Sequence, residues 1–197
     1  MKIYILRHEE RTIDATFFSP LTKVGMINAN NLILILEKLK ITKIVCSPYI
    51  RTIQTIYPFS KKKNLKLNLE YGLCEILHPT IIPPKSFNVE LPEYLCENYN
   101  YNPKYLSIIK STDLIYPEDE KKFKDRTKKI FKNLINRYHK TDETILIVTH
   151  QGMCKNILSI INNKNEIKIP DEELNNYGTG KITLIFNDLN WIYEKIN

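Results

Sequence analysis

Cysteine and glycine are scarce in this chain of 197 residues, which has four cysteines and five glycines. The cysteines form no C-x-x-C pair and no zinc-finger spacing, so neither a thioredoxin-like redox motif nor a zinc finger is expected. They lie at Cys46, Cys74, Cys96 and Cys154. No secretory signal is apparent, so we expect free thiols and a reducing, intracellular, cytoplasmic setting.

Long hydrophobic runs are also missing. The apolar start IYIL (Ile3–Leu6) is too short for a signal-peptide core or a membrane span, so no membrane association is expected. The formal net charge is +7, but the lysines are scattered, and KKKNLK at Lys61–Lys66 is the only compact basic run. Such a short run is typical of a solvated loop, so nucleic acid is not an expected partner.

Familiar phosphate and metal motifs are absent as well. The chain has no Walker loop, no aspartate cluster of the kind that holds Mg²⁺ and no H-E-x-x-H. The sequence therefore predicts no metal ligands and no cofactor. Any chemistry on a phosphate group would have to rely on cationic side chains.

What is present is an alternation of short apolar segments with helical patterns. Ile3–Leu6, Lys43–Ser47 and Thr144–Thr149 read as buried strands, and helices are predicted over about 22–40, 49–57, 117–138 and 150–162. A strand is also predicted within 65–72, and 181–186 with 191–196 form a predicted hairpin. This order predicts one α/β domain over 1–197, a three-layer α/β/α sandwich with a mainly parallel sheet.

Three helix boundaries carry specific signals. Thr22 is placed to cap the helix that follows it. Pro58 should end the helix before it, because the residue preceding a proline avoids the helical region. Pro117 should be the first residue of its helix and leave Glu118–Glu120 in the first turn, where acidic side chains favour the helix dipole.

The stretch from about 76 to 116 breaks this regular pattern. It contains five prolines and a cluster of tyrosines, and it has no clear periodicity. Long irregular segments inside a compact domain are commonly functional, and richness in aromatic residues is not typical of disorder. We expect a lid or specificity insertion here.

Polar side chains follow three of the predicted parallel strands. Arg7 and His8 end the first strand, Ser47 ends the second with Arg51 one helical turn beyond, and His150 follows the strand that closes with Thr149. The carboxyl ends of parallel strands open on the same crevice, so two arginines and two histidines should converge there. Guanidinium groups bind phosphate oxygens through paired hydrogen bonds, and a neutral imidazole can accept a phosphoryl group.

These segments resemble the histidine phosphatase superfamily, whose fold is that of the phosphoglycerate mutases. The similar motifs are RHEER at 7–11, LTKVGMINA at 21–29, SPYIRTIQT at 47–55, YGLCEI at 71–76 and VTHQG at 148–152. The segments HEERTID at 8–14 and LCE at 73–75 resemble the eukaryotic-type phosphatase branch more than the glycolytic mutases.

The resemblance implies a role for each matching residue. His8 would be the nucleophile that becomes phosphorylated, and Arg7, Arg51 and His150 would form the phosphate pocket. Glu75 would protonate the leaving oxygen and then activate water. Arg11 would add a further cation. The implied activity is hydrolysis of phosphate monoesters without a metal, acting on a phosphorylated small molecule or a phosphoprotein, with the oligomeric state left open.

Several alternatives remain open at this point. Glu9 stands where the family has a small residue, and it would repel phosphate if it faced inward; Asp14, the nearest counterpart of a family asparagine, adds to this effect. The protein could accordingly be a degenerate phosphate-binding or interaction module. A phosphoglycerate-type mutase needs the same pocket, and a metal-dependent hydrolase using His8, Glu9 and His150 is a more distant alternative. We expect structural roles for the remaining histidines and for Cys154, which should lie in the core.

Overall fold

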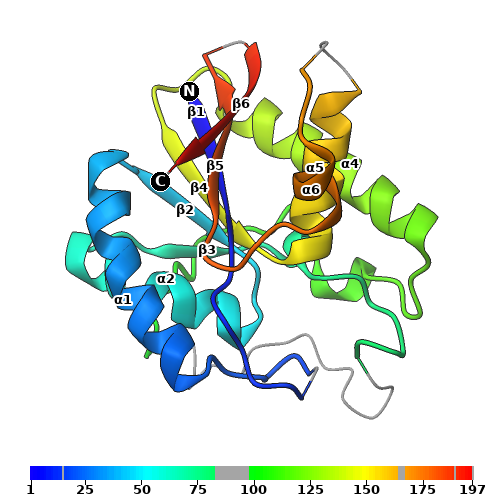
Figure 1. The fold of residues 1–197 in the computed structure, drawn as a ribbon, viewed down its shortest axis with the longest axis horizontal. Coiled ribbons are helices and arrows are strands. Elements are labelled where there is room, and N and C mark those ends of the chain that lie inside the picture. Colours follow the sequence, from blue (N-terminus) through cyan, green and yellow to red (C-terminus); the bar gives the residue numbers. More distant parts are fainter. Residues whose placement is uncertain (15, 83–97, 164–166, 189, 197) are drawn as a thin grey trace.

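The computed structural model describes residues 1–14, 16–82, 98–163, 167–188 and 190–196. A six-stranded sheet with the order β3-β2-β4-β1-β5-β6 runs through these residues (Figure 1). Its strands are β1 (Lys2–Arg7), β2 (Lys43–Cys46), β3 (Leu67–Leu69), β4 (Thr144–Thr149), β5 (Ile182–Asn187) and β6 (Asn190–Ile196). The first four strands of that order pair in parallel, whereas β5 is antiparallel to β1 and to β6. The predicted parallel sheet and the C-terminal hairpin are confirmed.

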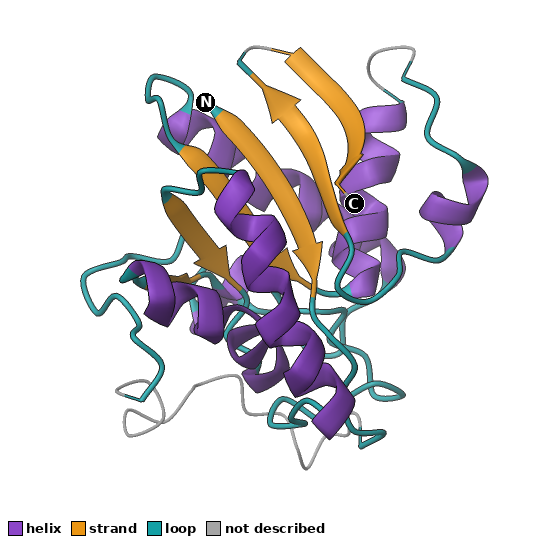
Figure 2. Cartoon of the chain, turned by 60° about the vertical axis from the view of Figure 1, so that its left-hand side comes forward, coloured by secondary structure: helices purple, strands orange, loops and turns teal. Residues whose placement is uncertain are grey.

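Helices cover both faces of the sheet, as Figure 2 shows. On one face lie α1 (Lys23–Lys38) and α2 (Ile50–Lys63), and on the other lie α4 (Glu120–Tyr138) and α5 (Gln151–Asn162) (Figure 1). The short α6 (Asp171–Asn175) and the 3-10 turns Tyr71–Leu73 and Ser111–Asp113 are the other elements within the described residues. The predicted three-layer α/β/α arrangement is therefore confirmed. None of the described helices has the length and apolar character that crossing a bilayer requires.

The sheet has a hydrophobic cluster on each face. Along β1, Ile3 and Ile5 pack among the buried residues of α4 and α5, whereas Tyr4 and Leu6 pack among those of α1 and α2. Successive side chains of a strand point to opposite faces, and here both faces are covered. This is why the strand reads as an uninterrupted apolar run.

The predicted end of α2 before Pro58 is wrong, because the helix continues through this proline to Lys63. An interior proline costs about 3 kcal/mol through a lost hydrogen bond and a steric clash. The continued helix buries Phe59, which is 1% exposed, and burial of such a side chain contributes roughly 1.5–3 kcal/mol. The Ser60 hydroxyl also donates to the Leu65 carbonyl at 2.6 Å. Tertiary packing offsets the local preference of proline.

The first turn of α4 also differs from the prediction. The helix begins at Glu120, and the Asp119 side chain caps it by accepting from the Lys122 N–H at 2.8 Å. Glu118 lies before the helix and is 3% exposed, paired with Arg126. An aspartate at the N-cap satisfies a free N–H group, and Glu118 has a buried guanidinium as its partner. By contrast, Thr22 caps α1 as predicted, accepting from the Gly25 N–H at 3.0 Å.

Much of the predicted insertion, 83–97, lies outside the described residues. The described part on its far side is organised by the buried carboxylate of Glu70. This carboxylate accepts hydrogen bonds from the N–H groups of Gly72, Ile108 and Ile109 and from the hydroxyls of Tyr105 and Ser107. Hydrogen bonds to a buried charged group are among the stronger ones, so Glu70 fixes this segment against the end of β3.

Candidate active site

The carboxyl ends of β1, β2 and β4 open on a cavity of about 540 Å³. Five of the six predicted site residues line it, namely Arg7, His8, Arg11, Arg51 and Glu75. The remaining lining residues are Glu10, Thr12, Ile13, Thr80, Ile81, Gln151 and Thr179. The sixth predicted residue, His150, does not line the cavity: it is fully buried behind it, with its ring centroid 5.3 Å from that of His8.

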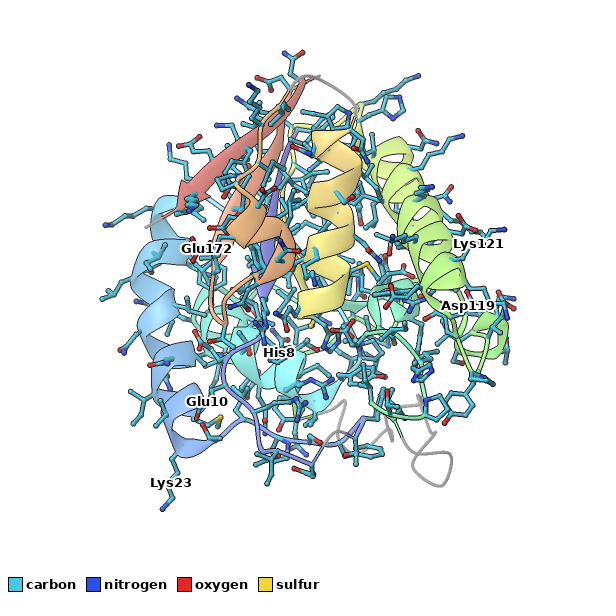
Figure 3. The ribbon with its side chains drawn as sticks, turned by 45° about the vertical axis from the view of Figure 1, so that its right-hand side comes forward. His8, Glu10, Lys23, Asp119, Lys121 and Glu172 are labelled. Carbon is cyan, nitrogen blue, oxygen red and sulfur yellow. The ribbon has the colours of Figure 1, made fainter. Side chains whose placement is uncertain are left out.

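His8 lies where the chain leaves β1, and Glu10 lies further along toward the start of α1 (Figure 3). The His8 Nδ1 is 2.7 Å from the Glu9 carbonyl oxygen. Since a carbonyl only accepts, Nδ1 carries the hydrogen, and Nε2 keeps the lone pair of the neutral ring. Burial, together with the nearby Arg51, lowers the pKa of His8 to about 3. The imidazole is therefore uncharged at neutral pH and has a nucleophilic nitrogen.

His150 is the N-cap residue of α5 and is also held without charge. Its Nε2 lies 2.8 Å from the Ser47 hydroxyl, and its buried Nδ1 has no hydrogen-bond partner among the described residues. Complete burial, followed by the charge of Arg51, lowers the pKa of His150 well below its ordinary value. The Ser47 contact joins the ends of β2 and β4 directly behind His8.

Arg7 and Arg51 bring positive charge to this site. Arg7 donates from Nη1 to the Tyr177 carbonyl, and Arg51 donates from Nη1 to the Thr16 carbonyl at 2.8 Å. The Nε atoms of both arginines are buried and unpartnered in the described part of the chain. Burial lowers the pKa of Arg7 and lowers that of Arg51 to about 10. A buried cation with unused donors is costly, so the site suits an anion.

Glu75 is held at the cavity by two backbone groups. Its Oε1 accepts from the Ile76 N–H and its Oε2 from the Gly152 N–H, both at 3.0 Å. Gly152 lies in the first turn of α5, and a Cβ there would be 2.3 Å from Glu75 Oε1. Only glycine permits this approach of the carboxylate to the helix.

The Glu9 side chain lies beside the cavity but does not line it. Glu9 is 5% exposed, so it does not face solvent, and its absence from the lining places its carboxylate outside the cavity where a phosphate would bind. Its carboxylate is packed against Gly180, where a Cβ would be 2.0 Å from Oε1, and Asn28 lies 3.5 Å from Oε2. Burial raises the pKa of Glu9. The glycine thus makes room for the side chain that departs from the family pattern.

Of the other residues named from the sequence, Arg11 lines the cavity and the rest lie outside its lining. Arg11 donates from Nη1 to the carbonyls of Thr12 and Asp14 at 2.6 and 3.5 Å. The Asp14 side chain is exposed and outside the lining. His139 is an exposed residue at the C-cap of α4, and His78 contacts Thr80. Cys154 is buried in the core, as predicted.

The sequence of residues 3–191 matches the model of the histidine phosphatase superfamily, branch 1. The chain belongs to this superfamily. None of the curated proteins is significantly similar to it in sequence.

Solved structures of phosphatases and of a phosphoglycerate mutase share the fold. The ecdysone phosphate phosphatase of Bombix mori has a TM-score of 0.76 at 14% identity, with 100% of this chain and 92% of that chain covered. The alpha-ribazole phosphatase of Shigella flexneri has a TM-score of 0.67 at 19% identity, with 100% of this chain and 96% of that chain covered. A phosphoglycerate mutase of Bacillus anthracis has a TM-score of 0.68 at 20% identity, with 100% of this chain and 92% of that chain covered.

Two features of the site were not predicted from the sequence. Thr179 and Gly180 reach the site because β5 runs antiparallel to β1, which brings the start of β5 to the carboxyl end of β1. The predicted hairpin contained that signal, but not its position in the sheet. The other feature is Arg126, a buried arginine of α4 that contacts the backbone around Glu75. Its helical spacing alone gave no sign of this contact.

Proposed function

We propose that this protein hydrolyses phosphate monoesters without a metal, through a phosphohistidine on His8. The observation that carries the proposal is an uncharged, buried His8 whose Nε2 keeps the lone pair, beside two arginines whose Nε atoms have no partner among the described residues. Arg7 and Arg51 would bind the phosphate oxygens and stabilise the charge that they carry during transfer. His150 would complete the pocket from behind.

In the first step His8 Nε2 attacks phosphorus, and the bond from phosphorus to the ester oxygen breaks. Glu75 in its acid form gives its proton to that oxygen, so the alcohol leaves neutral. In the second step the Glu75 carboxylate takes a proton from water. The water oxygen bonds to phosphorus, the P–N bond breaks, and free phosphate, neutral His8 and protonated Glu75 result.

A phosphorylated small molecule is the substrate that we propose. Two of the structurally similar enzymes are named as phosphatases of ecdysone phosphate and alpha-ribazole, which are small molecules. Thr80 and Ile81 line the mouth from the described start of the predicted insertion, which supports a role of that segment in substrate choice. Because β1 and β6 belong to one sheet, we propose a single catalytic domain over 1–197.

The test is turnover of phenyl phosphate with and without EDTA. We expect hydrolysis that resists the chelator and is lost in His8→Ala, with His139→Ala as the matched control because His139 is exposed and is not among the cavity-lining residues. Loss on adding EDTA would contradict metal independence. No turnover by the unaltered protein would overturn the phosphatase proposal, and transfer of the phosphoryl group to a sugar acid in place of water would identify a mutase.

A further inference from the structure

Arg126 of α4 and Glu118, which precedes this helix, form a buried ion pair near the cavity. Arg126 is 8% exposed and Glu118 is 3% exposed. The guanidinium binds the carboxylate with two parallel hydrogen bonds along its Nε–Nη2 edge. Arg126 Nε lies 2.8 Å from Glu118 Oε1, and Nη2 lies 2.6 Å from Oε2. Such a pair is weak evidence for stability, because desolvation of both charges opposes their attraction. The role of the pair is therefore sought in the other contacts that Arg126 and Glu118 make.

The remaining donors of Arg126 all point to the segment that carries Glu75. Nη1 donates to the carbonyls of Gly72 and Cys74 at 2.8 and 2.9 Å, and Nη2 donates to the carbonyl of Glu75 itself at 3.2 Å. With the two bonds to Glu118, these contacts use all five N–H groups of the guanidinium.

Glu118 holds the same segment on the other side of Glu75. Its Oε2 accepts from the Leu77 N–H at 3.2 Å, and its own N–H donates to the Leu77 carbonyl at 2.8 Å. The ion pair thus contacts the backbone before, at and after Glu75. The carboxylate of Glu75 in turn reaches the Gly152 N–H of α5.

We propose that Arg126 and Glu118 are positioning residues for Glu75, holding its backbone so that the carboxyl group meets the leaving oxygen. This inference rests on the proposed role of Glu75 as the proton donor. Neither residue touches the reacting atoms, and Arg126 acts through the carbonyls that it binds. Displacement of a catalytic group by about 1 Å can cost about 100-fold in rate.

The experiment compares two substrates with the same phosphate and different leaving groups. Phenyl phosphate needs a proton on its leaving oxygen, whereas 2,4-dinitrophenyl phosphate releases a stable anion without one. The measured quantity is kcat/KM, which reports the steps up to the first irreversible transfer. Glu75→Gln should lower kcat/KM for phenyl phosphate by about 10²–10⁴-fold and should lower it far less for the dinitrophenyl ester.

Arg126→Lys keeps the charge opposite Glu118 but cannot reproduce the five-bond fork. We expect it to lower kcat/KM for phenyl phosphate by about 10–100-fold, with less than about threefold loss for the dinitrophenyl ester. Arg137→Lys is the matched control: Arg137 is an exposed arginine of the same helix that bonds to the Leu106 carbonyl. It should leave both values unchanged.

Equal losses for both substrates in Arg126→Lys would overturn the inference, since a merely structural role does not depend on the leaving group. If Glu75→Gln itself fails to discriminate between the substrates, the proton-donor role in the proposed function is wrong, and the positioning role falls with it. If Arg126→Lys does not fold, Glu118→Gln replaces it, because the amide keeps the volume and one acceptor. A loss of kcat/KM confined to phenyl phosphate would then support the positioning role, and equal losses for both substrates would overturn it.

Discussion

Acid should destabilise the folded protein through His8, whose imidazole is buried in its neutral form. The folded-state pKa is about 3, against an ordinary value of 6.5. Above pH 6.5 both the folded and the unfolded chains are neutral at this residue, so the stability is fully present. Below pH 6.5 the unfolded chain binds a proton that the folded chain does not accept until the pH approaches 3. The free energy of unfolding therefore falls over this window.

The size of the effect follows from the width of the window. Each pH unit in which one additional proton is bound by the unfolded chain changes the free energy of unfolding by about 1.4 kcal/mol. Between pH 6.5 and pH 5 this amounts to about 2 kcal/mol from His8 alone. The lowered pKa of His150 adds a loss in the same direction, whereas the raised pKa of Glu9 acts in the opposite direction.

The assay is urea unfolding at pH 7.5 and pH 5 in a phosphate-free buffer, because a bound anion would add its own stabilisation. The variant is His8→Asn, whose amide can still donate to the Glu9 carbonyl. Contributions of other groups are largely shared by the two proteins and cancel in the comparison. The unaltered protein should lose about 2 kcal/mol more than the variant on acidification. The same loss in both proteins would refute the assignment of a neutral, buried His8.

Three further predictions concern close contacts. Gly180→Ala should lower the free energy of unfolding in urea by about 1–3 kcal/mol, because the position has φ +64° and its Cβ would meet the Glu9 carboxylate. Adding Glu9→Gly should recover part of the lost free energy of unfolding. If the double variant is as unstable as Gly180→Ala alone, the steric contact is not the cause. Gly152→Ala should lower kcat for phenyl phosphate about 100-fold by displacing Glu75, and full activity would exclude that displacement. Glu70→Ala should cost more than about 3 kcal/mol in urea unfolding, since it leaves several buried donors unpaired; a loss below about 1 kcal/mol would show that water satisfies them.

The strand ends that carry the site could be predicted because their signals are local. An apolar run that stops at Arg7-His8 or at Thr149-His150 indicates both a buried strand and the edge where it ends. The cap at Thr22 is local in the same way. The helix boundary at Pro58 could not be predicted from local signals. Whether the helix ends or continues there depends on how well the rest of the molecule buries Phe59.

The sequence by itself determined the order of strands and helices, the convergence of His8, Arg51 and His150 on one edge, and the family. The first two follow from hydrophobic periodicity and from the rule that parallel strands end at the same edge of a sheet, whereas the family follows from the resemblance of motifs such as RHEER at 7–11 and VTHQG at 148–152. Only the tertiary structure decided where Glu9 points and what holds Glu75. Both depend on contacts between residues far apart in the chain, with Gly180 beside Glu9 and Arg126 on the backbone of Glu75. Such contacts leave no local periodic signal, because they are made by packing of complete elements and not by the segments themselves.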